Sequence, residues 1–238
     1  MARRGPGPGR GRVLMARVAA MAAVVAKDLR VEVRARHAAA VVIPFVATLV
    51  VAFGLAMGPD ATALRGAAPG LVWVAGLFGT VLTSRRSYEA EFADDAFTGL
   101  VLSPVDRGGL FAGKATALAV QLLVLQVGVL LTVGLLYGAG QAVSLPALVA
   151  VVVLGVCGLA GLGALLGVVA GASRGREALL PLLVFPLAVP LLVAASRATG
   201  AALEGRGAEV TGWLGLLLAY DVAFWSVGLL FYEHMVED

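Results

Sequence analysis

The chain has 238 residues, of which 60% are hydrophobic and only 14% are charged, and its formal net charge is +3. Water-soluble domains carry about 25% charged residues, so this composition excludes a soluble globular protein and predicts an integral membrane protein. The single cysteine, Cys157, excludes an internal disulfide.

The N-terminal region divides into two predicted parts. Residues 1–12 contain mainly Gly, Pro and Arg, which predicts a disordered basic tail near anionic lipid. The remainder, residues 13–238, is predicted to form one transmembrane domain. Between Met15 and His37, apolar residues recur every three or four positions and basic residues fill the other face. This pattern predicts an amphipathic helix in the membrane interface.

Six apolar segments follow. Each is predicted to cross a hydrocarbon core of about 30 Å as a helix, because backbone polar groups in lipid must be satisfied within the segment. The predicted spans are Ala38–Met57, Pro69–Thr83, Ala115–Tyr137, Pro146–Gly171, Ala178–Ala195 and Trp213–Phe231. The fold class is therefore all-α integral membrane with six transmembrane helices.

The distribution of Lys and Arg predicts the orientation. Fifteen of the eighteen lie up to Arg36, within residues 84–114 or within residues 172–177, and the other three lie in the alternate connections. Because the cytosolic side of a membrane protein is enriched in Lys and Arg, both termini are predicted to be cytosolic. The chain is expected in the cytoplasmic (inner) membrane.

A hydrophilic segment, Arg85–Lys114, separates the second and third spans and is predicted to be cytosolic. It begins with four carboxylates in seven residues, Glu89, Glu91, Asp94 and Asp95. Three interpretations are open: a solvated helix face, a divalent metal site, or a docking surface for a basic partner. Tyr88 and Phe92 lie four residues apart and add an apolar patch, which favours docking.

The same segment ends in a near match to the phosphate-binding pattern G-x-x-x-x-G-K-[ST], from Gly108 to Ala115. Alanine replaces the final Ser or Thr, and a membrane span follows in place of a soluble domain. We therefore predict no nucleotide binding by this chain. Lys114 is instead expected to anchor one end of the third span.

Two later spans carry unusual residues. In the fourth span, Gly163, Gly167 and Gly171 recur every four residues, which allows close helix approach within one subunit or at a sliding or dimeric interface. Pro181, Pro186 and Pro190 predict a kinked or broken fifth helix, as a static kink or a moving hinge. The connection Ser196–Gly212 is predicted to be an extracytoplasmic loop.

Asp221 is an acidic residue well inside the sixth span. At the bilayer centre such a residue costs about 2.5–3.5 kcal/mol on insertion scales, so a partner is expected. Gln121, Gln126 or a backbone carbonyl are the candidates. Asp221 has either a structural interhelical hydrogen bond or a place in a polar substrate path.

His37 and His234 both fall at predicted membrane edges, and the sequence has no haem attachment motif. We interpret both histidines as interfacial residues. The residues themselves indicate no catalytic site, because no nucleophile–base pair and no metal cluster can be recognised. An enzyme is therefore not predicted.

The cytosolic segment resembles the coupling region of type-2 ABC exporter permeases. The resemblance rests on the acidic residues followed by Phe97-Thr98-Gly99-Leu100, Leu102-Ser103-Pro104 and Gly113-Lys114. It implies six helices per subunit in a homodimer, with a cytosolic coupling helix between the second and third spans that contacts a separate ATPase. The residues that it assigns to ATPase coupling are Tyr88, Glu89, Glu91, Phe92, Asp94, Asp95, Gly99, Ser103 and Pro104.

Two further segments, Lys27-Asp28-Leu29-Arg30 and the proline-containing run Leu180–Pro190, resemble the haem exporter protein B family. This resemblance implies the membrane subunit of an ABC transporter in cytochrome c maturation. Its implied partners are a cytosolic ATPase that binds ATP, a haem-handling membrane protein and a small accessory membrane protein. Haem is the implied cargo, and the chain itself is expected to bind no cofactor and no nucleic acid.

Two alternative functions stay open at this point. One is a type-2 ABC permease for a drug, a lipid or a polysaccharide. The other is a membrane scaffold without a transport role, for which no ATPase partner is expected.

Overall fold

A computed structural model describes residues 22, 25, 26, 30, 37–93, 107–138, 142–171 and 179–234 of the chain. Within the long ranges, side chains are described for residues 44–85, 108–138, 142–167 and 182–232. The predicted N-terminal tail, most of the predicted interfacial helix and residues 94–106 lie outside the described part.

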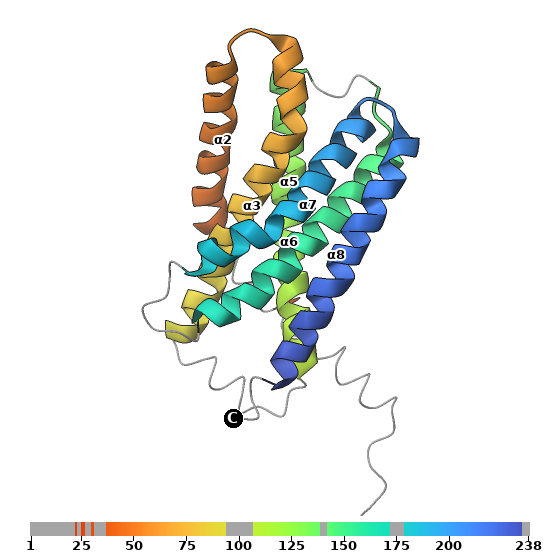
Figure 1. Cartoon of the computed structure of the whole chain (residues 1–238). Coiled ribbons are helices and arrows are strands. Elements are labelled where there is room, and N and C mark those ends of the chain that lie inside the picture. The colour runs from red at the N-terminus through yellow and green to blue at the C-terminus, as the bar shows by residue number, and fades with distance from the viewer. Residues whose placement is uncertain are drawn as a thin grey trace, which may run out of the picture.

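Long helices make up this part, and it contains no strand. They are α2 (His37–Met57), α3 (Ala61–Ala93), α5 (Arg107–Tyr137), α6 (Leu145–Gly171), α7 (Leu179–Leu203) and α8 (Gly207–His234). Successive helices run in opposite directions through one bundle (Figure 1). We call the end where α3, α6 and α8 finish and α5 and α7 begin the Lys114 end, and the opposite end the Arg206 end.

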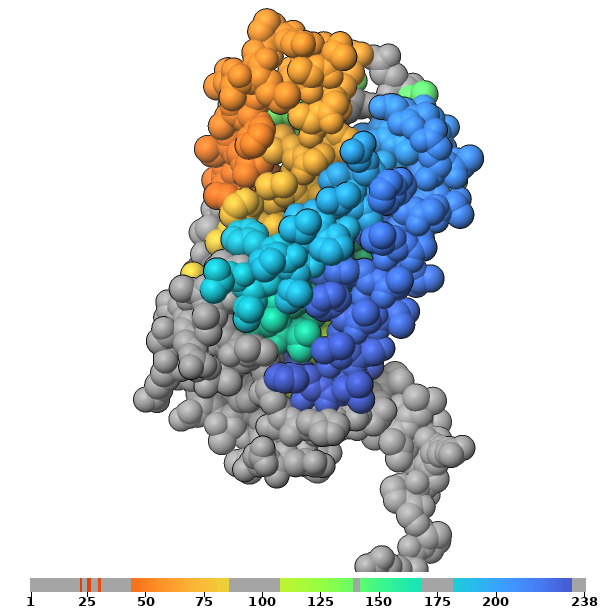
Figure 2. Space-filling view, in the orientation of Figure 1, coloured from red at the N-terminus to blue at the C-terminus, as the bar shows by residue number. Residues whose placement is uncertain are grey.

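Helix α6 is the centre of the bundle. It packs against α3, α5, α7 and α8, whereas α2 lies at the edge and contacts mainly α3. In the space-filling view, α7 and α8 cover most of α6 on the visible face (Figure 2). Glycines make the close packing possible: a Cβ atom at Gly155 would overlap the ring of Trp73, and one at Gly161 would lie 2.8 Å from the indole of Trp225.

The glycine-rich helix was predicted to approach its neighbours closely, and Gly163 shows where it does so. A Cβ atom there would lie 2.7 Å from Ser84 Oγ on α3, so this glycine serves packing within the chain. The same is true of Gly155, Gly158 and Gly161. For these four positions the structure supports the intrachain interpretation.

Five helical segments of the described residues are long and apolar enough to cross a membrane. They are Ala61–Arg85, Gly108–Tyr137, Leu145–Gly167, Leu182–Leu203 and Gly207–Tyr232. Each overlaps one of the predicted second to sixth spans, so the chain is an all-α, multi-pass membrane protein. Helix α2 has 21 residues, of which Pro44–Met57 form a shorter apolar stretch with described side chains. The count of six spans stays a prediction.

The prediction that Ser196–Gly212 forms a loop is wrong. Helix α7 continues to Leu203 and α8 begins at Gly207, so most of this region is helical. Gly205 has a φ of 73°, which favours glycine and permits the tight turn between the helices. The charged residues that indicated a loop lie on helix ends and in the turn between them, because a helix can continue beyond the hydrocarbon.

The connection between α2 and α3 is equally short. Gly58 has a φ of 68°, and Asp60 accepts hydrogen bonds from the backbone N–H groups of Thr62 (2.9 Å) and Ala63 (3.2 Å). This is an N-cap, which satisfies donors that the first turn of α3 leaves unpaired. It starts α3 eight residues before the predicted span at Pro69.

Candidate functional site

The first part of the predicted ATPase-coupling segment continues α3. Tyr88, Glu89, Glu91 and Phe92 lie in the last turns of this helix, but their side chains are not described. The sequence turns hydrophilic at Arg85, and the helix ends at Ala93. At about 1.5 Å per residue, the helix extends about 12 Å beyond Arg85.

The other predicted coupling residues lie outside the described part of the chain. They are Asp94, Asp95, Gly99, Ser103 and Pro104. Their role in binding an ATPase therefore stays a prediction, as does the coupling helix. Helix α3 ends just before this segment and α5 begins just after it, and both of these helix ends lie at the Lys114 end of the bundle (Figure 1).

The residues that resemble a phosphate-binding loop are helical. Gly108–Ala115 lie in the first turns of α5, so their backbone does not form the loop that such a site requires. Lys114 is buried, and it has an interaction partner. The helical geometry does not fit a phosphate-binding loop, and the anchoring role of Lys114 stays a prediction.

Next to this segment, α5, α6 and α8 form a second apolar core. Phe111 is fully buried there, with its ring centroid 5.8 Å from that of Trp225 and 5.2 Å from that of Tyr232. We call Phe111, Trp225 and Tyr232 the aromatic cluster. Ala164 and Leu165 of α6 complete this core. No sequence pattern predicted this cluster; its one sequence signal is an aromatic residue, Phe111, one turn into α5.

Asp221 lies on the buried face of α8, opposite Gly158 of α6. A Cβ atom at Gly158 would lie 2.7 Å from Asp221 Oδ1, so the glycine makes room for the carboxyl group. Asp221 is 8% exposed, and its Oδ1 atom has no hydrogen-bond partner among the described residues. The described part of the chain therefore supplies no interhelical hydrogen bond to Oδ1 of the kind that was predicted.

Gln126, one of the predicted partners of Asp221, contacts a different helix. Its Nε2 donates to the backbone carbonyl of Val72 on α3 (3.1 Å), and its Oε1 has no partner among the described residues. A Cβ atom at Gly76 would lie 2.5 Å from this oxygen. Gln121 is half-buried on α5. The predicted pairing of Asp221 with Gln126 is therefore wrong.

Two tryptophans, the buried Trp73 and the half-buried Trp225, hold helices together through their indole N–H groups. Trp73 on α3 donates to Thr199 Oγ1 on α7 (2.8 Å), and Trp225 on α8 donates to the carbonyl of Cys157 on α6 (3.1 Å). A buried indole N–H needs such a partner. Trp73 and Thr199 were not singled out in the sequence, although a tryptophan inside an apolar span indicates that a partner is required.

The prolines do not break α7. Pro181 lies in the first turn of the helix, where a missing N–H has no intrahelical partner to lose. Pro186 and Pro190 lie in the interior, and the helix still continues to Leu203. Both side chains are exposed on the bundle surface. The Tyr220 hydroxyl donates to the carbonyl of Leu187, between these prolines (3.1 Å).

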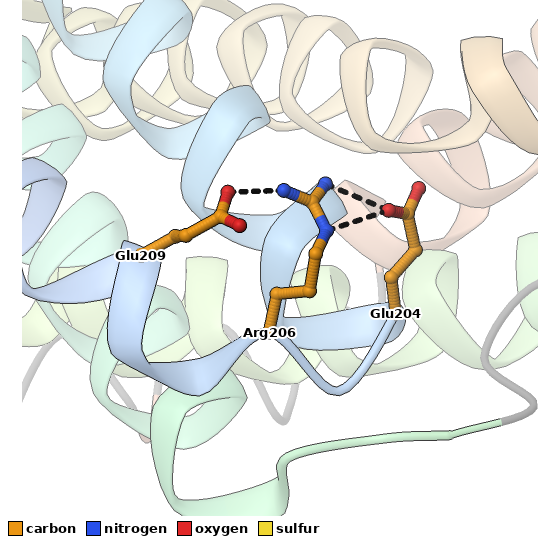
Figure 3. A network of polar contacts seen from close by, with 3 residues as sticks. All are labelled: Glu204, Arg206 and Glu209. Carbon is orange, nitrogen blue, oxygen red and sulfur yellow. Dashed lines mark hydrogen bonds and ion pairs between the residues drawn. The ribbon is translucent and has the colours of Figure 1, made fainter.

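At the Arg206 end, the turn between α7 and α8 carries an exposed ionic network. Arg206 donates to Glu204 through Nε (2.9 Å) and Nη2 (2.7 Å), and also contacts Glu209 (Figure 3). The hydrogen bonds that Arg206 donates to Glu204 and the negative charge of both carboxylates raise the pKa of the Arg206 guanidinium. The network has one guanidinium and two carboxylates, and both carboxylates contact the same guanidinium.

No group of three potential metal ligands occurs among the described residues. His37 begins α2 and His234 ends α8, but neither side chain is described. Their predicted interfacial position therefore stays a prediction.

Comparison with known families decides what kind of membrane protein this bundle is. The sequence pattern of the family described as "CcmB protein" matches residues 19–236. The chain belongs to the CcmB protein family. The match begins before α2 and runs through α8, and it includes the segment between α3 and α5.

Several relatives carry the name "Heme exporter protein B". The relative from Pseudomonas aeruginosa is 33% identical over 172 residues, which cover 68% of this chain and 72% of the relative. The relative from Paracoccus denitrificans is 33% identical over 174 residues, covering 73% and 79% respectively. The Escherichia coli K12 relative is 30% identical over 195 residues, covering 79% and 86%. The family named from sequence resemblance is thereby confirmed.

Proposed function

We propose that this chain is the transmembrane subunit of an ABC transporter that exports haem during cytochrome c maturation. The observation that carries the proposal is the CcmB family match over residues 19–236, supported by relatives named "Heme exporter protein B". Haem is the cargo in this proposal. We assign no resident cofactor to the chain, and ATP is bound by a separate subunit.

We propose that a partner subunit binds and hydrolyses ATP, because the start of α5 is helical and does not form a phosphate-binding loop. The one segment that resembles a nucleotide-binding motif is helical and ends at the buried Lys114. A transporter subunit of this kind needs a cytosolic ATPase to supply the free energy. The chain is therefore a non-catalytic permease subunit.

The ATPase is proposed to bind the segment between α3 and α5. Helix α3 extends past Arg85, where its sequence turns hydrophilic, and carries Tyr88, Glu89, Glu91 and Phe92 in its last turns. Asp94 and Asp95 follow directly. Acidic and aromatic residues at the end of a projecting helix are suited to a basic partner surface, through charge complementarity and apolar contact.

The proposed topology has six spans, with both termini in the cytosol and the Lys114 end facing it. The concentration of Lys and Arg before α2 and within residues 84–114 supports this orientation. In the inner membrane, two copies of the chain would form the permease. A haem-handling membrane protein and a small accessory membrane protein complete the proposed complex. ATP hydrolysis would then drive haem export or release of the haem-loaded periplasmic chaperone.

Purification of the tagged chain from its native membrane tests this proposal. We expect an ATP-binding subunit and haem-handling proteins to co-purify. Reversing the charge of Glu89, Glu91, Asp94 and Asp95 together should strongly reduce recovery of the ATPase. Glu209→Lys is the matched control, because it reverses an exposed carboxylate at the opposite end of the bundle.

Three results would contradict parts of the proposal. Recovery of the ATPase without haem-handling proteins would contradict haem as the cargo. Equal recovery with and without the four charge reversals would contradict the docking surface. Absence of any ATPase would contradict the transporter function itself.

A further inference from the structure

Helix α8 contacts three other helices through a small number of aromatic and glycine positions. These positions are Tyr220, Trp225, Gly228 and Tyr232. Trp225, Gly228 and Tyr232 are spaced by three and four residues and share one face of α8, whereas Tyr220, five residues before Trp225, lies on an adjoining face. The four positions extend from the Lys114 end toward the centre of the bundle.

The first contact links α8 to the start of α5. Phe111 lies four residues after Arg107, the first residue of α5, and its side chain is fully buried. A Cβ atom at Gly228 would overlap the Phe111 ring, so this ring packs directly on the backbone of α8. The edge of the Phe111 ring also meets Trp225, with an interplanar angle of 76°. A displacement of the start of α5 therefore pushes on α8.

The second contact links α8 to the central helix. The Trp225 indole donates to the carbonyl of Cys157 (3.1 Å), and Gly161, one turn along α6, lies against the same indole. The glycine leaves room for the ring, and the hydrogen bond fixes its orientation. Trp225 therefore holds α8 on α6 immediately beside its contact with Phe111.

The third contact links α8 to the proline-containing part of α7. Pro190 has no N–H to donate to the carbonyl of Pro186, so α7 lacks a backbone hydrogen bond at this point. The Tyr220 hydroxyl donates to the next carbonyl, that of Leu187 (3.1 Å). The Tyr220 ring is itself stacked on Phe224 at 4.3 Å, which limits its freedom. A shift of α8 is thereby passed to a segment of α7 that has fewer internal hydrogen bonds.

We propose that α8 transmits movement from the start of α5 to the Pro186–Pro190 segment of α7, with Phe111, Trp225 and Tyr220 as the positioning residues. This inference rests on the proposed function, because the movement would originate where the ATPase binds the segment between α3 and α5. Phe111 is the input residue, Trp225 fixes the helix on α6, and Tyr220 is the output residue. Movement of α7 would then follow ATP binding without direct contact between α7 and the ATPase.

Three substitutions remove single parts of this connection. Tyr220→Phe removes the hydroxyl and keeps the stacked ring, so it is nearly isosteric. Trp225→Phe removes the indole N–H and keeps a smaller aromatic ring. Phe111→Leu keeps a buried apolar side chain but loses the ring contact with Gly228. Each variant keeps an apolar side chain of substantial size at its position, so the bundle is expected to fold.

The experiment uses the complete complex with an environment-sensitive fluorophore on α7. Cys157→Ala removes the only cysteine, and it leaves the backbone carbonyl that accepts from Trp225. Val189→Cys then places the fluorophore on an exposed position between the two prolines. We expect ATP with vanadate to change its emission. Each of the three substitutions should reduce that change by about fivefold, the lower end of typical coupling between sites.

Thr199→Val is the matched control. It removes a hydrogen bond of similar length from the same helix, but this bond runs to Trp73 on α3 and not to α8. We expect the full ATP-dependent emission change in this variant. Recovery of the ATPase subunit is measured in every preparation and should be unchanged in all four variants.

Two results would overturn the inference while the proposed function stands. One is an unchanged emission response in Tyr220→Phe and Trp225→Phe. The other is a parent complex that retains its ATPase and shows no ATP-dependent change at residue 189. Loss of the ATPase from the parent complex would overturn the proposed function, and the inference with it.

Discussion

The two ends of the bundle are held together in different ways. At the Arg206 end, α7 and α8 are joined by the short turn between Leu203 and Gly207, and the ion pairs around Arg206 are exposed. At the Lys114 end, α5 and α8 are far apart in the chain, and buried rings bring them together. The covalent turn keeps two helices adjacent without the ion pairs. The contact between α5 and α8 depends on side chains, so mutations there should have larger effects.

Phe111→Ala should give the largest loss of stability. The substitution leaves a cavity where the ring packs on Gly228 and Trp225. We expect a loss of about 3 kcal/mol, the lower end for Phe→Ala in soluble cores, because helices in lipid lack part of the hydrophobic driving force. Reversible denaturation in mixed micelles measures it. Leu131→Ala, at a 62% exposed position of α5, is the control, and equal losses in both would contradict the comparison.

Gly155→Ala extends the comparison to the packing of α6. The added methyl group would overlap the Trp73 ring, so we expect a loss of about 1–3 kcal/mol from overpacking. Gly128→Ala is the matched control, because nothing lies within 4 Å of its added Cβ atom. Alanine has the higher helix propensity, so the control should be neutral or slightly more stable. A stable Gly155→Ala variant would show that the bundle is not close-packed here.

Thr199→Val tests a single buried hydrogen bond. It removes the acceptor of the Trp73 indole N–H and keeps the shape of the side chain. We expect a loss of about 1 kcal/mol in the free energy of unfolding. Trp73→Phe in combination with Thr199→Val should add less than the sum of the separate effects, because both remove the same bond. Fully additive losses would show that the bond does not contribute.

Arg206→Gln should give the smallest effect. The guanidinium is exposed and its partners lie in the turn, so the contact is screened by solvent. We expect no measurable change in the denaturation midpoint, in low or high salt. If Arg206→Gln markedly lowers the denaturation midpoint in low salt but not in high salt, the ion pairs stabilise the bundle. That result would contradict the claim that the covalent turn alone holds α7 and α8 together at the Arg206 end.

The sequence was sufficient to predict the helical membrane fold because apolar length is a strong signal. All five described helices that are long and apolar enough to cross a membrane overlap predicted spans. The helix ends were less accurate: charges such as Arg197 and Glu209 indicated a loop, but helices extend beyond hydrocarbon. Turn residues such as Gly205 gave the better signal for where the chain reverses.

The interior contacts were not predictable in the same way. Helical periodicity shows which residues share a face, but it does not show which neighbouring helix that face meets. Gln126 was therefore one of three candidate partners of Asp221, whereas its Nε2 donates to the carbonyl of Val72 on α3. The contact of Phe111 with Gly228 joins residues more than a hundred positions apart, and no local pattern contains it.

The most direct test of the proposed function is the covalently bound haem of periplasmic c-type cytochromes in a strain that lacks this chain. Haem staining, normalised to the amount of apocytochrome, measures it with and without the chain supplied from a plasmid. We predict that the deletion removes the haem signal and that the wild-type chain restores it. An undiminished signal in the deletion strain would contradict a role in haem delivery for cytochrome c maturation.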